Sequence, residues 1–168
     1  MNADELRATQ SPLKSRYRDE PQAARITLRA HGALDDAHIA CKVETGRALA
    51  VAGLHPATGG SGAELCSGDM LLEALVACAG VMLKAVATSM GIALRSGEVS
   101  AEGDLDFCGT LGVDKQAPVG FTDIRLNFAL DTDAAQDQLD TLLKLTERYC
   151  VVLQTLKRPP TLTAAIAR

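Results

Sequence analysis

The stretch MLLEALVACAGVMLKAVATSM, residues 70–90, decides the fold of this chain. It is almost wholly apolar, and Gly91 follows it as a helix stop. At roughly 100° per residue Glu73 and Lys84 fall on nearly the same side of a helix, so they form one narrow polar stripe. The stretch has the length of a membrane span. Two charges interrupt it, however, so we expect the buried central helix of a globular protein and no membrane insertion.

The composition of the whole chain indicates a globular protein of the cytoplasm. Its 168 residues are enough for a domain with a hydrophobic core, and 23 % of them are charged. The net charge of −4 argues against nucleic acid as a partner, because phosphate binding favours a basic surface. The first residues, MNADELRATQ, contain no apolar leader. Five cysteines without such a leader favour free thiols in a reducing cytoplasm.

The order of the predicted elements indicates an α+β fold. Residues 1–23 are a polar arm with a short helix over Ala3–Thr9, and residues 24–168 form one domain. We expect a second long helix over 139–150, opened by a capping box of Asp133 and Gln136. Loops are expected at 55–69 and 108–119. The predicted strands are residues 26–31, 38–43, 47–54, 93–107, 120–130 and 161–167. The resulting order is β-β-β-α-β-β-α-β.

Cys78 and Cys150 are the candidate reactive residues. Cys78 lies in the middle of the central helix, and Cys150 ends the second helix, where Leu139, Leu142, Leu143, Thr146 and Cys150 share one face. Two such thiols could meet in space as a redox pair. The commoner role of a cysteine in an apolar helix is that of a small core residue, and an apolar setting raises the pKa of its thiol. Arg148 stands beside Cys150, and Lys157 and Arg158 follow a short distance on, so these cations could activate its thiol.

The other candidate chemistries receive no support from the sequence. Cys41, Cys66 and Cys108 stand apart from one another and are expected to be incidental. The three histidines have no metal-ligand spacing, so neither a metal nor another cofactor is expected. The Gly-rich loop at 55–69 lacks the Gly-Lys-Ser/Thr of a phosphate-binding loop. No serine lies in a hydrolase motif.

Two blocks of the sequence resemble the OsmC/Ohr family. The first is GGSG at 59–62 followed by LLEALVACAG at 71–80, and the second is LTERYCVV at 145–152 followed by QTL at 154–156. Members of this family are thiol-dependent peroxidases that reduce organic hydroperoxides. The resemblance implies antiparallel sheets around two long central helices, and an intertwined homodimer with its active sites at the interface.

The resemblance also implies roles for individual residues. Cys78 would be the nucleophile that becomes a sulfenic acid, Cys150 would condense with it to a disulfide, and an external dithiol would reduce both. The family's activating arginine would be Arg29 or Arg47.

The family's activating glutamate, ten residues before the nucleophile, is replaced here by Gly68, and Asp69 stands one position on. An alternative therefore stays open. It is an OsmC-fold dimer without peroxidase activity that binds a small apolar ligand at the subunit interface.

Overall fold

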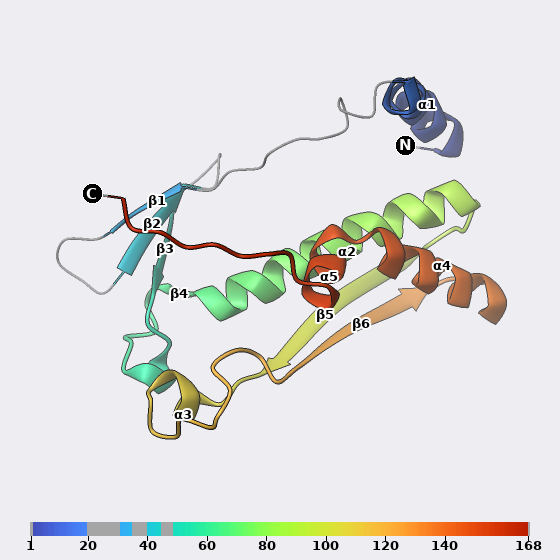
Figure 1. Cartoon of the computed structure of the whole chain (residues 1–168). Coiled ribbons are helices and arrows are strands. Elements are labelled where there is room, and N and C mark those ends of the chain that lie inside the picture. The colour runs from blue at the N-terminus through green and yellow to red at the C-terminus, as the bar shows by residue number, and fades with distance from the viewer. Residues whose placement is uncertain (1, 20–30, 35–39, 45–48, 168) are drawn as a thin grey trace. The chain divides into compact units, whose positions relative to one another are not determined.

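The computed structural model describes residues 2–19, 31–34, 40–44 and 49–167, which fall into two compact units (Figure 1). The helical unit comprises Met1–Arg7, Ala74–Ser100 and Asn127–Arg168, and the sheet unit comprises Ala8–Glu73 and Ala101–Leu126. Together they contain helices and small sheets, which confirms the predicted α+β class. The boundary predicted at residue 24 lies outside the described residues.

The N-terminal helix α1 spans Ala3–Asp19 and is longer than the expected Ala3–Thr9. A reciprocal capping box opens it, because the Glu5 N–H donates to Asn2 Oδ1 and the Asn2 N–H donates to Glu5 Oε2, both at 2.9 Å. Pro12 lies inside the helix without ending it. The residues after Pro12 include leucine, lysine and arginine, which are good helix formers.

A four-stranded sheet forms the N-terminal part of the sheet unit. Strands β1 (His31–Leu34), β2 (Ala40–Glu44) and β3 (Leu49–Gly53) pair antiparallel, and the short β4 (Leu65–Cys66) pairs parallel with β3. The strands expected at 38–43 and 47–54 correspond to β2 and β3 with shifted bounds. The strand expected at 26–31 lies outside the described residues except for His31. The predicted loop after β3 contains β4 and one turn of 3-10 helix, η2 (Pro56–Thr58).

The long helix α2 spans Ser67–Met90 and ends where the sequence predicts. Gly91 has a φ of 71°, a left-handed conformation that favours glycine. The N–H of Ile92 donates to the carbonyl of Ala87 at 2.9 Å, which closes the last turn of the helix.

Strands β5 (Ser96–Asp104) and β6 (Asp123–Asp131) form a two-stranded sheet. The Arg95 N–H donates to the Asp131 carbonyl at one end, and the Thr122 N–H donates to the Asp104 carbonyl at the other, so the strands run antiparallel. Burial alternates strictly along β6, which fits a strand with one covered face. The predicted loop between the strands includes a single helical turn, α3 (Phe107–Thr110).

The C-terminal region corrects two sequence predictions. Helix α4 spans Gln136–Tyr149, and its cap is Ala135, whose N–H donates to Gln138 Oε1 at 3.1 Å. The predicted capping box of Asp133 and Gln136 is therefore wrong, because the Asp133 carboxylate binds Arg95 instead.

The expected closing strand is also absent. Residues 151–157 form helix α5 (Val151–Lys157), and residues 159–167 have no regular structure. Pro159 and Pro160 lack backbone N–H donors, and all the side chains over 159–167 are exposed. The segment therefore has neither a hydrogen-bonded neighbouring strand nor a buried face that would stabilise it as a strand.

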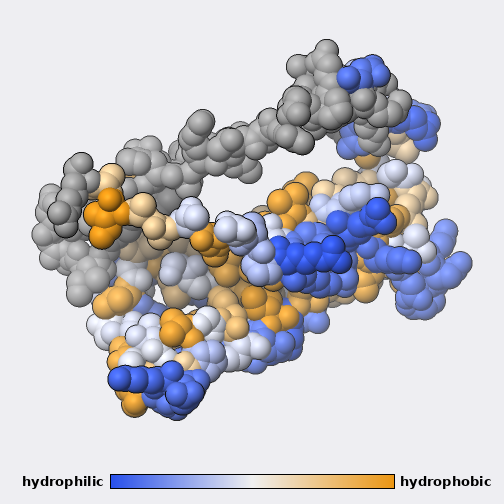
Figure 2. Space-filling view, viewed as in Figure 1, coloured by the Kyte–Doolittle hydropathy of each residue, from blue (hydrophilic) through white to orange (hydrophobic). Residues whose placement is uncertain are grey.

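The core of the helical unit forms where α2 meets α4. Its buried residues are Leu83, Val86, Ala87, Ile92 and Leu142. Only 28 % of the most apolar window of α2 is buried, and Val81 is 71 % exposed. By length and composition alone α2 could cross a membrane, with a hydropathy of 2.0. The expectation of a helix buried on nearly all sides is therefore wrong for the single chain, and Figure 2 shows hydrophobic surface left open among hydrophilic patches.

Candidate active site

The structure brings Cys78 and Cys150 together within the helical unit. Cys78 lies on α2 and is partly buried, whereas Cys150 connects α4 to α5 and is 0 % exposed. The Cys78 side chain lies close enough to Cys150 to raise the pKa of its thiol. Both cysteines carry free thiols. Two residues that are far apart in the sequence thus form a dithiol in one hydrophobic layer.

Helical periodicity on both elements produces this meeting. Leu142, Thr146 and Cys150 follow one another at intervals of four residues, and each is at most 1 % exposed. On α2 the covered face includes Leu75 and Ala79, both 0 % exposed, on either side of Cys78. Leu142 packs with Leu83, Val86 and Ala87, beyond Cys78 along α2. The two helices therefore run antiparallel along this seam.

The environment of Cys150 keeps its thiol protonated. Burial is the largest cause that raises the pKa of Cys150, and the adjacent Cys78 raises the pKa further. The backbone N–H groups of Leu153 and Val152 act in the opposite direction and lower the pKa. These groups belong to the first turn of α5, which sequence reasoning missed because it expected a strand there.

The cations expected beside Cys150 are occupied elsewhere or do not act on it. Lys157 Nζ binds Glu147 Oε2 at 2.8 Å, and the Arg148 guanidinium lies 5.7 Å from the ring centroid of Tyr149. None of Arg148, Lys157 and Arg158 is among the causes that shift the pKa of Cys150. Backbone N–H groups thus supply the favourable electrostatics that were expected from side-chain cations.

The remaining predicted site residues are not assembled around this pair. Arg29 and Arg47 lie outside the described residues. Asp69 precedes Cys78 by nine residues in α2. In a regular helix this spacing places two side chains on opposite sides and about 13 Å apart along the axis. A role for Asp69 as the activating acid stays a prediction.

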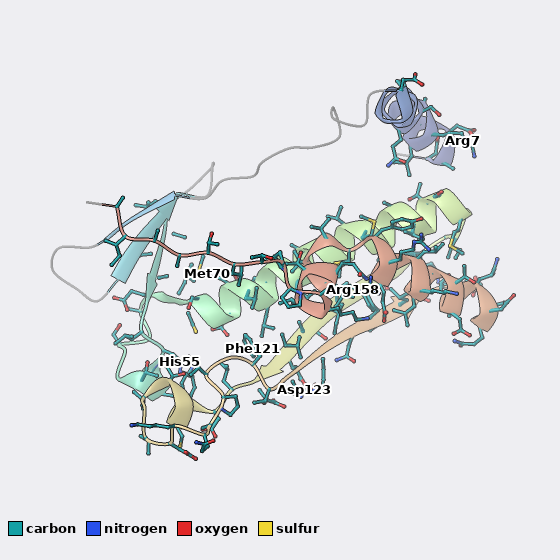
Figure 3. The ribbon with its side chains drawn as sticks, in the orientation of Figure 1. Arg7, His55, Met70, Phe121, Asp123 and Arg158 are labelled. Carbon is teal, nitrogen blue, oxygen red and sulfur yellow. The ribbon has the colours of Figure 1, made fainter. Side chains whose placement is uncertain are left out.

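Gly68 and Asp69 line a cavity of the sheet unit together with Cys66. Its walls include Phe107 and Phe121, and the Phe107 ring stacks on His55 at 5.0 Å between centroids. Figure 3 labels His55 and Phe121 in this part of the chain.

A side chain at Gly68 would enter this cavity. A Cβ there would lie 3.5 Å from Cys66 Sγ and 3.5 Å from Phe121 Cζ, which is ordinary van der Waals contact. The backbone at this position therefore accepts a larger residue than the glycine that the sequence has.

The other described cysteines show no sign of a second redox pair. Cys108 is exposed, and its pKa is raised, first by its hydrogen bond with the Asp106 side chain. Within the described ranges no three His, Cys, Asp or Glu side chains converge in a way that could hold a metal ion.

Thr146 is a further polar residue of this region that sequence reasoning did not single out as functional. Its side chain is 1 % exposed, and its Oγ1 has no hydrogen-bond partner. The sequence feature that could have pointed to Thr146 is its hydroxyl on an otherwise apolar helix face, four residues before a cysteine.

Comparison with known proteins identifies the family. The sequence model of the OsmC-like protein family matches residues 60–165. No curated protein matches the chain in sequence. Among solved structures the chain is similar to an OsmC-like protein from Mycoplasma pneumoniae, with 13 % identity and a TM-score of 0.65, covering 80 % of this chain and 89 % of that one.

Two further structures are organic hydroperoxide resistance proteins. The OsmC protein from Legionella pneumophila has 14 % identity and a TM-score of 0.62, with 80 % of this chain and 93 % of that chain covered. The protein from Elizabethkingia anophelis has 14 % identity and a TM-score of 0.63, with 81 % and 91 % covered. At these identities the likeness shows a shared fold.

Proposed function

Because the chain belongs to the OsmC-like protein family, we propose that it is a cytoplasmic thiol peroxidase that reduces organic hydroperoxides with Cys78 and Cys150. The observation that carries the proposal is the proximity of these two thiols within the helical unit. The Legionella and Elizabethkingia structures of the same fold are organic hydroperoxide resistance proteins, which supports the choice of substrate class.

The difference in burial supports different roles for the two cysteines in the proposed reaction. Cys78 is only partly buried, whereas Cys150 is 0 % exposed, so an incoming peroxide reaches Cys78 first. The Cys78 sulfur attacks the peroxide, the O–O bond breaks, and an alcohol leaves with the thiol proton while Cys78 becomes a sulfenic acid. The Cys150 thiol then attacks the Cys78 sulfur, water leaves and a disulfide forms. An external dithiol reduces this disulfide by thiol exchange.

The open apolar surface of α2 supports a homodimer as the working form. Val81 on α2 and Val151 at the start of α5 are 71 % and 68 % exposed, and both belong to the helical unit. Burial of such side chains against a second copy of the chain would remove apolar surface from water, at roughly 25 cal/mol per Å².

Mass spectrometry after one equivalent of cumene hydroperoxide tests the peroxidase proposal. We expect a mass loss of two hydrogen atoms, mapped by peptide analysis to a Cys78–Cys150 bridge. A protein whose thiols stay unmodified under these conditions would contradict the proposal. The Cys78→Ser variant is the matched control and should form no bridge.

Gly68 favours a second candidate function. An acid at this position would be the family's activator, and its loss is consistent with an OsmC-fold dimer that binds a small apolar ligand at the interface without turnover. Unmodified thiols after peroxide treatment, in a protein that is dimeric by analytical ultracentrifugation, would support this second function.

A further inference from the structure

The hydroxyl of Thr146 is a buried polar group without a partner. Thr146 is 1 % exposed, and its Oγ1 is the only buried side-chain nitrogen or oxygen atom of the described residues that makes no hydrogen bond. Buried polar atoms are nearly always paired in folded proteins, because leaving one unpaired is unfavourable. A lone exception in a functional region therefore calls for a partner that arrives with the ligand or the reaction.

The position of Thr146 identifies the region that it serves. Thr146 precedes Cys150 by one helical turn, and the Cys150 N–H donates to the Thr146 carbonyl at 3.0 Å. Neighbours at this spacing lie on the same helix face, about 5–6 Å apart between Cβ atoms. The Cys150 side chain in turn meets Cys78. The hydroxyl thus lies one turn from the thiol pair.

The fully buried side chains of this region are mainly aliphatic. The fully buried side chains flanking the seam between α2 and α4 are those of Leu75, Ala79 and Leu142, which are aliphatic. The hydroxyl makes no hydrogen bond to either sulfur in the reduced pair. Thiol sulfur is a weak acceptor, whereas an oxygen atom is a strong one.

We propose that Thr146 Oγ1 donates a hydrogen bond to the oxygen atom that the peroxide transfers to Cys78. The inference rests on the proposed function and adds a catalytic residue to it. In the first step the Cys78 sulfur gains this oxygen, the O–O bond breaks and the alcohol leaves with the thiol proton. Thr146 is unchanged, and its hydrogen bond holds the oxygen until Cys150 displaces it as water.

A purely structural role for Thr146 predicts different behaviour. A core threonine contributes shape and packing, so Thr146→Val, which keeps the shape and removes the hydroxyl, would leave the reaction rate unchanged. Thr146→Ser keeps the hydroxyl and removes the methyl group, so it would cost packing and spare the chemistry. The two variants therefore separate hydrogen bonding from packing.

The test compares two reactions of Cys78 in the full-length protein and its Thr146 variants. The first is the single-turnover reaction with cumene hydroperoxide, and the second is alkylation by iodoacetamide, which delivers no oxygen to the sulfur. We expect Thr146→Val to slow the peroxide reaction about tenfold, the usual size for the loss of one good hydrogen bond, with alkylation within twofold of the wild type. Thr146→Ser should react with peroxide within twofold of the wild type.

A second measurement follows the sulfenic acid that carries the transferred oxygen. In the Cys150→Ser background, where the sulfenic acid is not resolved, we expect Thr146→Val to shorten its lifetime severalfold, as measured by dimedone trapping. The melting temperature of Thr146→Val should equal or exceed that of the wild type, because a buried unpaired hydroxyl has been removed.

The outcomes separate this inference from the function on which it rests. A wild-type protein that does not react with peroxide overturns both. A reactive wild type with an unchanged Thr146→Val rate overturns the inference alone. Equal slowing of peroxide reaction and alkylation, or equal slowing in both Thr146 variants, also overturns it, because the effect would then lie in the thiol or in packing.

Discussion

Two thiol environments in this chain differ in what surrounds the sulfur. In the helical unit Cys78 meets a second thiol, Cys150, within an aliphatic seam. In the sheet unit Cys66 lines a cavity of about 370 Å³ that has aromatic walls, an imidazole from His55 and a carboxylate from Asp69. The first environment holds a partner sulfur and few polar groups, and the second holds polar groups without a partner sulfur among its lining residues.

The difference shows which ingredient decides the chemistry. A nearby charge changes the rate at which a thiol reacts, because it changes the thiolate fraction. A second sulfur changes the product, because it converts a sulfenic acid into a disulfide that a dithiol can reduce. Only the helical unit meets this second condition in the described part of the chain, so the turnover that we propose belongs to that unit.

Replacing Cys78 of the helical unit or Cys66 of the sheet unit by serine tests this comparison most directly. We expect Cys78→Ser to lower dithiothreitol-dependent consumption of cumene hydroperoxide by roughly a hundredfold or more, because it removes the nucleophile. The matched Cys66→Ser variant should stay within twofold of the wild type. The opposite ranking would move the reactive thiol to the sheet unit. The assay is loss of peroxide at fixed protein and dithiol concentrations.

The features of the fold that depend on local sequence were the most predictable. The 3.6-residue period of the apolar residues and the glycine after Met90 predicted α2 to its last residue, because periodicity and a left-handed cap are local properties. The closing strand over 161–167 was mispredicted, because β-branched and apolar residues favour a strand only where a neighbouring strand exists to receive it.

The two cysteines of the candidate site could be named from the sequence, whereas the groups that surround them could not. Cys78 and Cys150 carry a sequence signature, but their pairing depends on how α4 packs against α2. The N–H groups that act on Cys150 depend on α5, a helix of seven residues that follows α4 after a single residue. The periodicity of apolar residues does not reveal a single-residue interruption between two helices, so the start of α5 at Val151 was missed.

The protonation state of Cys150 gives a second test with an intermediate effect. Burial raises the pKa of Cys150 in the folded chain, so the folded state retains a proton that the unfolded chain loses above the ordinary thiol pKa of about 8.5. The contribution of this group to stability is therefore complete below about pH 8.5, and it is lost as the pH rises through the raised value.

We therefore expect the free energy of unfolding in urea, under reducing conditions, to fall between about pH 8 and pH 10. The fall should be smaller in Cys150→Ala, which has no thiol to titrate at this position. Cys66→Ala, which removes a thiol from the sheet unit instead, is the control and should follow the wild type. Identical pH profiles for Cys150→Ala and the wild type would contradict a buried, protonated Cys150.

The smallest effect concerns the charges at the edge of the Cys66 cavity. Asp104 lines this cavity, and its pKa is lowered, chiefly by hydrogen bonds from the Arg125 guanidinium. We expect Arg125→Gln to return the pKa of Asp104 toward its ordinary value, measured by carbon-detected NMR titration between about pH 2 and pH 6. Arg95→Gln is the matched control, because Arg95 binds Asp131 and Asp133 in the helical unit and should leave the titration of Asp104 unchanged.

The sign of the linked stability change follows from the lowered pKa. A carboxylate stabilised in the folded state contributes above the ordinary aspartate pKa of about 3.9, and the contribution is lost as the pH falls through the lowered value. Arg125 and Asp104 are solvent-exposed, so water and salt screen their interaction, and the change in melting temperature should be small at every pH. A titration of Asp104 that Arg125→Gln does not move would mean that the ion cluster is not held in solution.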